Sequence, residues 1–391
     1  MNANTVKDVV FIIATILIPM DGLRLGKVGP AEILMLVWCL FNLDKTKNMM
    51  KSKLLIEFWL VFLSVLLLST SYGVIYYPEE SWSFAGVITY VYFAIVSIMV
   101  CQTFCGRSIN SIYAVVKWIS FGSSIWYFSL YILAKRGMTS LLGAPLWFYS
   151  KFTGGAQNPN KLASYLNFIF VLSIIVFKTS KKWYEKCLGL VCLGIVFFIG
   201  ATTDSKMFIL AVVATIGMLI IFEILKIFSE IDKIRFVTTS ISLLCMMIMF
   251  LYDEIYMLFY KIVASDSNGL GRFRLFASIT YTLEKNPIIG LGPGGHALNG
   301  TQAYHSTYFE ILAMVGIVGM FVFVIFSIKL IKKVWAYKVW IVLIGMLYFL
   351  GIAHFAFRSF EYWVAVGLAI AVAETSNIHV CEKKRRISSY E

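Results

Sequence analysis

Long apolar segments separated by short polar connectors recur along the whole chain. A helix needs about 20 consecutive apolar residues to cross the hydrocarbon core of a bilayer. Of the 391 residues, 60% are hydrophobic and only 14% are charged, which excludes an ordinary soluble domain. We therefore predict an all-α polytopic membrane protein, with residues 1–391 as a single transmembrane domain. Hydropathy predicts twelve spans, near residues 8–20, 30–43, 54–76, 84–104, 113–134, 160–177, 187–202, 206–225, 236–252, 306–328, 339–354 and 360–374.

The lysine and arginine residues are sorted between alternate connectors. If the N-terminus is placed inside, the inner segments carry 21 of them and the outer segments carry 11, although the outer segments are longer in total. Cytoplasmic loops of membrane proteins carry an excess of these residues. The sorting predicts that both termini are cytoplasmic, that residues 375–391 form a basic cytoplasmic tail, and that residues 253–305 lie outside. It also accounts for the net charge of +13 without a nucleic-acid partner.

Residues 253–305, between the ninth and tenth predicted spans, form the one long polar loop of the sequence. Long loops inside compact domains are usually functional or disordered, and the apolar residues at helical spacing over residues 275–283 favour an ordered, helical loop. Arg272 and Arg274 lie at the start of this helical segment, which Asn286-Pro287 ends. Two arginines at a helix start suit a diphosphate. We therefore expect the loop to contribute to an active site.

A run of glycines follows, in which residues 290–295 match the pattern G-x-G-x-x-G. A dinucleotide-binding fingerprint needs a preceding strand within a βαβ unit, whereas a helix and Asn-Pro precede this run. We therefore reject that interpretation. Two alternatives remain open: a tight turn that re-enters the membrane, or a loop whose backbone amides face a phosphate.

Further candidates lie at the outer ends of predicted spans. His305 precedes Ser306 and Thr307, which are good helix N-caps, and a lone histidine at such a place is more often structural than catalytic. Asn158-Pro159-Asn160 is typical of a turn that caps the sixth span. Lys206 falls on the first turn of the eighth span, where a cation opposes the helix dipole, so we expect an anion nearby.

Five short motifs together resemble the O-antigen polymerase and O-antigen ligase superfamily. They are Asn158-Pro159-Asn160, Gly271-Arg272, Asn286-Pro287-Ile288-Ile289-Gly290-Leu291-Gly292, His305-Ser306-Thr307-Tyr308-Phe309-Glu310 and Gly316-Ile317-Val318-Gly319. The motifs cover about a third of the chain, and the topology extends the resemblance to the rest. One departure is Ser205-Lys206, where the family often has Ser-Arg. This difference matters because lysine keeps the positive charge but lacks the fork with which arginine binds two oxygens.

The resemblance implies a GT-C-like glycosyltransferase whose donor is an undecaprenyl-diphosphate-linked oligosaccharide, with no metal and no other cofactor. The predicted outer segments of this chain contain no carboxylate cluster typical of a metal site. Such an enzyme must stabilise the departing diphosphate and deprotonate an acceptor hydroxyl. On this basis His305 is the expected catalytic base. The expected substrate-binding residues are Arg272, Arg274, Lys206, Arg358, Asn158, Asn160 and Tyr308.

Two functions of this superfamily differ in their acceptor. An O-antigen polymerase transfers the growing glycan to the next lipid-linked repeat unit, and an O-antigen ligase transfers it to lipid A core. We favour the polymerase, because each distinct repeat unit needs its own polymerase. A transporter or flippase is the third alternative, but it would carry ionisable residues within its spans, and these spans are almost free of charge. The resemblance implies the bacterial inner membrane, and membrane lipid and a chain-length regulator protein as partners.

Overall fold

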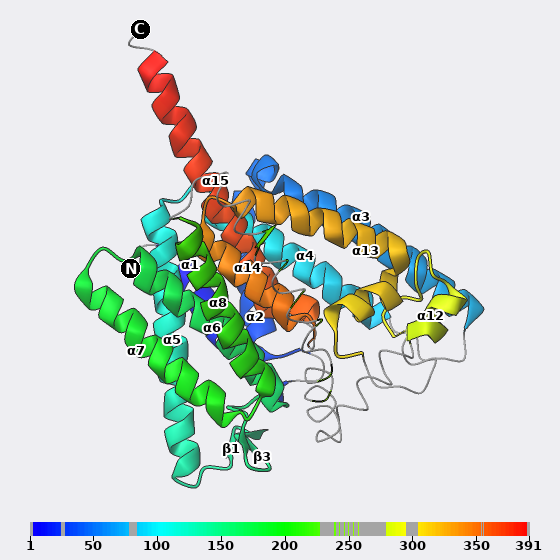
Figure 1. Cartoon of the computed structure of the whole chain (residues 1–391), viewed down its shortest axis with the longest axis horizontal. Helices are drawn as coiled ribbons and strands as arrows, with labels where there is room; N and C mark the ends of the chain where they lie inside the picture. Colours follow the sequence, from blue (N-terminus) through cyan, green and yellow to red (C-terminus); the bar gives the residue numbers. More distant parts are fainter. Residues whose placement is uncertain are drawn as a thin grey trace.

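The computed structural model describes residues 3–24, 28–77, 84–226, 279–294, 304–352, 354 and 356–388, with isolated positions between 238 and 257. The described part is mostly helical (Figure 1). Its helices are α1 (Ala3–Ile16), η1 (Asp21–Leu23), α2 (Pro30–Phe41), η2 (Leu43–Ser52), α3 (Lys53–Tyr76), α4 (Phe84–Phe104), α5 (Ile109–Lys135), α6 (Pro159–Thr179), α7 (Trp183–Thr202), α8 (Lys206–Leu225), α12 (Ile279–Lys285), α13 (Thr307–Val334), α14 (Lys338–Leu350), η4 (Ala356–Arg358) and α15 (Phe360–Ser388).

Helices occupy every predicted span except 236–252, which lies outside the described residues apart from isolated positions. Among the described helices, six are long and apolar enough to cross a membrane: α3, α4, α6, α7, α8 and α13. The apolar helices α2 and α14 are shorter. The protein is thus a helical, multi-pass membrane protein, and twelve spans remain a prediction.

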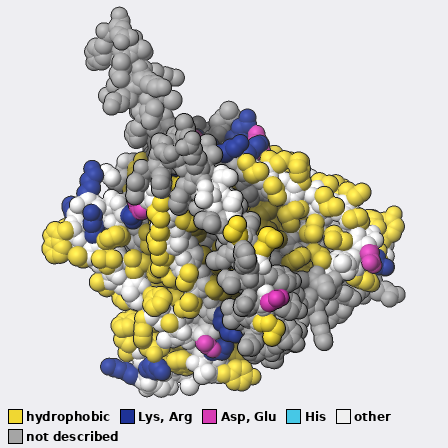
Figure 2. Space-filling view, viewed as in Figure 1, with side chains coloured by type: hydrophobic (Ala, Val, Ile, Leu, Met, Phe, Trp, Pro, Cys, Tyr) yellow, Lys and Arg dark blue, Asp and Glu magenta, His cyan; other side chains and the backbone are white. Residues whose placement is uncertain are grey.

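The helices differ in how deeply they are buried within the protein. In α6, 83% of the most apolar stretch is buried, compared with 28% in α7 and 22% in α8. The first part of α15 is buried almost completely, from Phe360 to Ala373. Because lipid covers the outward apolar side chains of a membrane protein, α6 and α15 form its interior, and α7 and α8 lie at its edge. Outside the grey atoms, hydrophobic side chains are spread widely over the visible face, and charged side chains gather in small separate groups (Figure 2).

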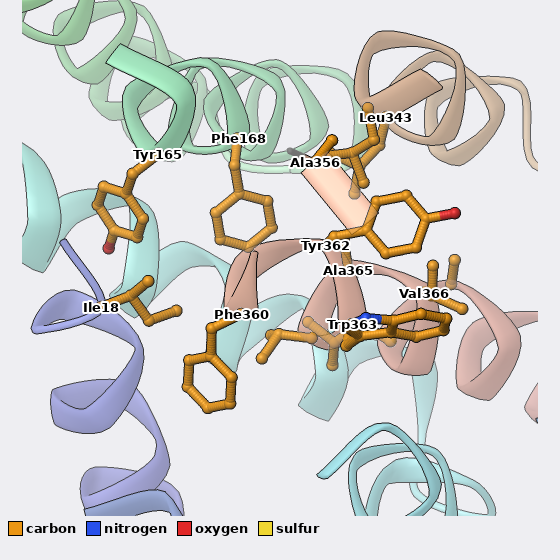
Figure 3. Close-up of a cluster of buried hydrophobic side chains, with 14 of the residues drawn as sticks. Ile18, Tyr165, Phe168, Leu343, Ala356, Phe360, Tyr362, Trp363, Ala365 and Val366 are labelled. Atoms are coloured by element: carbon orange, nitrogen blue, oxygen red, sulfur yellow. The ribbon is translucent and has the colours of Figure 1, made fainter. Parts of the chain in front are cut away.

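The centre of the core is aromatic. Figure 3 shows Tyr165 and Phe168 of α6 close to Phe360, Tyr362 and Trp363 of α15. All five are buried, and aromatic rings in such tilted and edge-to-face arrangements add packing energy beyond their buried area. This core fixes the start of α15 against the start of α6, and the candidate site lies where the two meet.

The connection between α5 and α6 contains the described strands, which an all-α prediction did not include. Strands β1 (Ser140–Leu141) and β2 (Ala144–Pro145) form one antiparallel pair, and β3 (Trp147–Phe148) and β4 (Lys151–Phe152) form another. Leu142 and Gly143, between β1 and β2, both have positive φ, which suits a two-residue hairpin turn. These hairpins lie at the end of the molecule away from the C-terminus (Figure 1).

Candidate functional site

A cavity of about 280 Å³ opens where the starts of α6, α13 and α15 meet. It brings together four residues expected at the active site: Asn158, Asn160, His305 and Arg358. The other side chains that line it are those of Lys161, Ser164, His354, Ser359 and Glu361. All of these lining residues are polar, and polar groups at the ends of membrane helices are costly unless they are paired or wetted. A polar cavity enclosed by three helix starts is the arrangement expected of a functional site.

Asn158 fixes the start of α6. Its side-chain oxygen accepts a hydrogen bond from the Asn160 amide at 2.8 Å, and Pro159 occupies the first helical position. The predicted N-cap is therefore confirmed. Because Asn158, Lys161 and Ser164 are three residues apart, the first turns of α6 present them on one face, toward the cavity.

His305 has a left-handed backbone, with φ of 51°, and its side chain is half-buried. Non-glycine residues rarely adopt this conformation, which costs about 1–3 kcal/mol and persists only where the surroundings enforce it. Here Thr307 enforces it: its amide donates to Gly351 O at 2.8 Å, and its hydroxyl donates to His354 O at 2.9 Å. Ser306 is the N-cap of α13 as predicted, but its hydroxyl bonds to Gly351 O at 3.3 Å and makes no cap bond. The start of α13 is thus fastened to the connection between α14 and α15.

Arg358 forms an ion pair with Glu310, at 3.4 Å between Nη1 and Oε1. The Glu310 side chain is buried, whereas that of Arg358 is 48% exposed, so the carboxylate holds the guanidinium from the protein side. Burial lowers the pKa of Arg358, but the Glu310 carboxylate raises it, and the net shift is upward. Arg358 is therefore a fixed positive charge at the cavity, able to donate to an anion.

Lys161 and Glu361 line the cavity but are not among the predicted site residues. Lys161 Nζ lies 2.8 Å from Asp21 Oδ2, and Asp21, at 6% exposure, also accepts from the Gln157 amide at 2.9 Å. Glu361 is 1% exposed, and its Oε1 accepts from Ser164 at 3.2 Å. Lys161 follows Asn158 by three residues and Glu361 follows Arg358 by three, so helical spacing from the chosen residues was the available signal.

The glycine run packs into a break in α13. Inside this helix Gly316 has φ of 61° and ψ of −162°, a conformation almost restricted to glycine, and the regular hydrogen bonding stops there. The Leu291 and Gly292 amides donate to the freed carbonyls of residues 313 and 314, both at 2.9 Å. In return, the amides of residues 317 and 318 donate to the carbonyls of residues 287 and 288, at 2.9 and 3.1 Å.

These bonds decide between the two interpretations of the glycine run. The amides of Leu291 and Gly292 already bond to carbonyls of α13, and that of Gly290 bonds to Asn286 O at 3.1 Å. A Cβ atom on Gly290 would meet Ala313 O at 2.6 Å. The run is therefore a tight turn against a membrane helix, and these three amides do not face a phosphate. The helix α12 ends at Lys285, directly before Asn286-Pro287, as predicted.

Comparison with protein families identifies residues 189–324, about a third of the chain, as a match to the family described as O-antigen ligase. This match supports the resemblance of the segment to the O-antigen ligase and polymerase superfamily. Members of this superfamily are glycosyltransferase-like enzymes that act on lipid-linked oligosaccharides in membranes. Comparison with curated proteins finds no match.

The cavity joins matched and unmatched parts of the chain. His305 and Glu310 lie within the matched residues. Lys161 precedes them, and Arg358 and Glu361 follow them. The family match therefore covers one wall of the site, and the fold adds the others.

Some residues expected to bind substrate lie elsewhere or outside the described part. Lys206 is exposed at the start of α8 and is not among the side chains that line the cavity. The Tyr308 hydroxyl donates to Tyr348 O at 2.8 Å, and its ring packs on Phe323, which is a packing role. Arg272, Arg274 and most of the loop 253–305 lie outside the described residues.

The cavity combines paired cations with hydrogen-bonding groups. Its lining contains two cations, Lys161 and Arg358, and one acid, Glu361. Each cation has a buried acid behind it, Asp21 or Glu310, which stabilises the charge in a region where lone charges are costly. Within the described residues, no three His, Cys, Asp or Glu side chains are grouped to hold a metal ion. The described cavity thus offers paired cations, two imidazoles and amide groups.

Proposed function

We propose that this protein is an O-antigen polymerase, which transfers a growing glycan from undecaprenyl diphosphate to the next undecaprenyl-diphosphate-linked repeat unit. The single observation that carries the proposal is the cavity in which His305 of the matched family segment faces the same space as Arg358 and Lys161. An imidazole beside two cations has the groups needed to deprotonate a hydroxyl and to stabilise a departing diphosphate.

The proposed reaction is one in-line displacement. His305 accepts the proton of the acceptor hydroxyl while that oxygen attacks the anomeric carbon of the donor glycan. The bond from this carbon to the diphosphate oxygen breaks, and its electron pair leaves with undecaprenyl diphosphate, so the anomeric configuration inverts. Arg358 and Lys161 stabilise the growing charge on the diphosphate, and Asn158 and Asn160 bind sugar hydroxyls. The reaction needs no metal, because fixed cations take that role.

Arg272, Arg274 and Lys206 remain proposed contacts to the donor. Arg272 and Arg274 belong to the loop 253–305, which we propose to be periplasmic and to contribute to the active site. We further propose twelve spans, a GT-C-like fold, both termini in the cytoplasm and a location in the inner membrane. Membrane lipid and a chain-length regulator protein are the further proposed partners, and residues 375–391 are the proposed basic tail.

The ligase is the second candidate, because the matched family is described as O-antigen ligase. The cavity suits either acceptor, since both present a sugar hydroxyl. Polymerase remains the proposal because every distinct repeat unit needs its own polymerase. Deletion of the gene followed by gel analysis of lipopolysaccharide separates the two. Core carrying one repeat unit means a polymerase, bare core means a ligase, and unchanged lipopolysaccharide would contradict both.

A further inference from the structure

A second polar hollow lies at the other end of α6 from the candidate site, between the start of α5, the end of α6 and the start of α7. Its volume is about 350 Å³. The side chains that matter here are those of Asn110, Lys117, Lys181, Lys182 and Glu185. By the sorting of lysine and arginine, this end of the molecule faces the cytoplasm. The proposed transferase reaction uses none of these residues.

The hollow carries an excess of positive charge. Lys117 of α5 pairs with Glu185 of α7, at 2.9 Å between Nζ and Oε1, and this pair contributes no net charge. The lining then retains the charges of Lys181 and Lys182, both of which are exposed. Lysine ammonium groups at this level attract phosphate, and the Asn110 amide adds hydrogen-bonding capacity.

An apolar groove of about 800 Å³ runs along the protein beside this hollow. It lies between α1 and α5, with lining side chains from residues 5–16 and 111–129. The stretch of α5 rises roughly 27 Å, at about 1.5 Å per residue, which is close to the roughly 30 Å of a bilayer's hydrocarbon core. Of its lining side chains, Asp8 is charged, and it is paired with Arg107 at 2.7 Å. The groove is therefore electrically neutral and suited to a hydrocarbon chain.

The two hollows meet at Ala114, which lines both of them. A positively charged hollow that continues into a membrane-deep apolar groove is complementary to an amphiphile with an anionic head. Free phosphate would use only the hollow, and a zwitterionic lipid would gain little from two further lysines. We propose that the hollow and the groove together bind one anionic phospholipid of the cytoplasmic leaflet, with its phosphate at Lys181 and Lys182 and an acyl chain between α1 and α5.

The first test uses the purified full-length protein in a neutral detergent. Native mass spectrometry counts the bound lipid, and Tm is measured after each lipid or headgroup compound is added. Phosphatidylglycerol should be retained and should raise Tm. Phosphatidylethanolamine with the same acyl chains, and glycerol 3-phosphate without any, should do neither. Equal effects of both lipids would overturn the assignment of the head, and an equal effect of glycerol 3-phosphate would overturn the assignment of the groove.

The second test separates this site from general surface charge. Lys181→Ala and Lys182→Ala should each weaken phosphatidylglycerol binding about fivefold, and the double variant about thirtyfold, since a lysine near an anionic lipid contributes about 1 kcal/mol. Lys186→Ala removes the same charge from the first turn of α7, at a side chain that does not line the hollow, and should leave binding unchanged. Ala114→Phe should block the junction and lower lipid retention. Equal losses in Lys186→Ala and Lys181→Ala would contradict the proposal.

Discussion

Replacing His305 by asparagine tests the proposed base without disturbing the start of α13. Because His305 has φ of 51°, most substitutions would add strain, but asparagine tolerates this backbone better than other non-glycine residues. The bonds that hold the helix start come from Ser306 and Thr307 and stay in place. We therefore expect His305→Asn to leave the stability of the protein nearly unchanged, because asparagine accepts the left-handed backbone at this position.

The expected loss of activity is much larger. A general base contributes about a hundred- to ten-thousandfold to a rate, or about 2.7–5.4 kcal/mol at about 1.36 kcal/mol per tenfold. Elongation of lipid-linked repeat units by purified His305→Asn should fall by that factor, while donor binding stays normal. His379→Asn, in the proposed cytoplasmic tail, is the matched control and should elongate normally.

In contrast to His305→Asn, the variant Arg358→Lys should weaken donor binding. Lysine keeps a positive charge opposite the buried Glu310 carboxylate but loses the planar fork that binds two phosphoryl oxygens. A charge-assisted hydrogen bond contributes about 1.5–3 kcal/mol, so donor binding should weaken roughly ten- to a hundredfold. Normal donor binding in this variant would move the diphosphate site to Lys161 or to the loop 253–305.

One result would refute the role of His305. If His305→Asn makes polymer of normal length at the normal rate, the histidine is structural. Glu361 is then the next candidate base, because it lines the same cavity. Asp204 is a weaker candidate, since its side chain is 75% exposed, pairs with Lys151 at 3.1 Å and does not line the cavity.

Three further predictions concern the fold, a charge and the topology. Gly316→Ala should destabilise the protein by more than about 1–3 kcal/mol and lower its Tm, because its Cβ would overlap Ile288 O at a backbone conformation that only glycine adopts readily; Gly194→Ala, with open space around its Cβ, should not. Lys206→Arg should be tolerated and Lys206→Ala should shorten the polymer; an unchanged chain length in the alanine variant would make Lys206 an interfacial anchor only. Reporter fusions at residues 183 and 269 should report opposite sides of the membrane, and the same side for both would end the proposed topology.

The helices could be predicted because hydropathy and capping are local properties. Asn158 caps α6, α8 begins at Lys206 and α12 ends before Asn286-Pro287, each as the sequence indicates. The short hairpins were missed because their turns depend on Leu142 and Tyr149, which are residues that seldom take positive φ. Nothing in the local sequence forces that conformation.

Only part of the site could be predicted. His305 and Arg358 were selected from motifs, and the fold brings them to one cavity. Lys161 was overlooked because it lies at the edge of a span, where a lysine usually anchors the helix to the interface. Its pairing with Asp21, 140 positions away in the chain, depends on tertiary structure. Glu361 was missed for the same reason, since only the packing of α15 against α6 brings it to Ser164.

The backbone hydrogen bonds between the glycine run and α13 determine where residues can be inserted into this chain. Four backbone hydrogen bonds link residues 287–292 to residues 313–318, so residues 287, 288, 291 and 292 each have a fixed partner in α13. One residue inserted within 287–292 would shift every later partner by one position and bring a side chain to a place where only glycine fits. An insertion after Gly294 would leave those bonds untouched. Variation in loop length is therefore expected between Gly294 and Tyr304 and not within the turn.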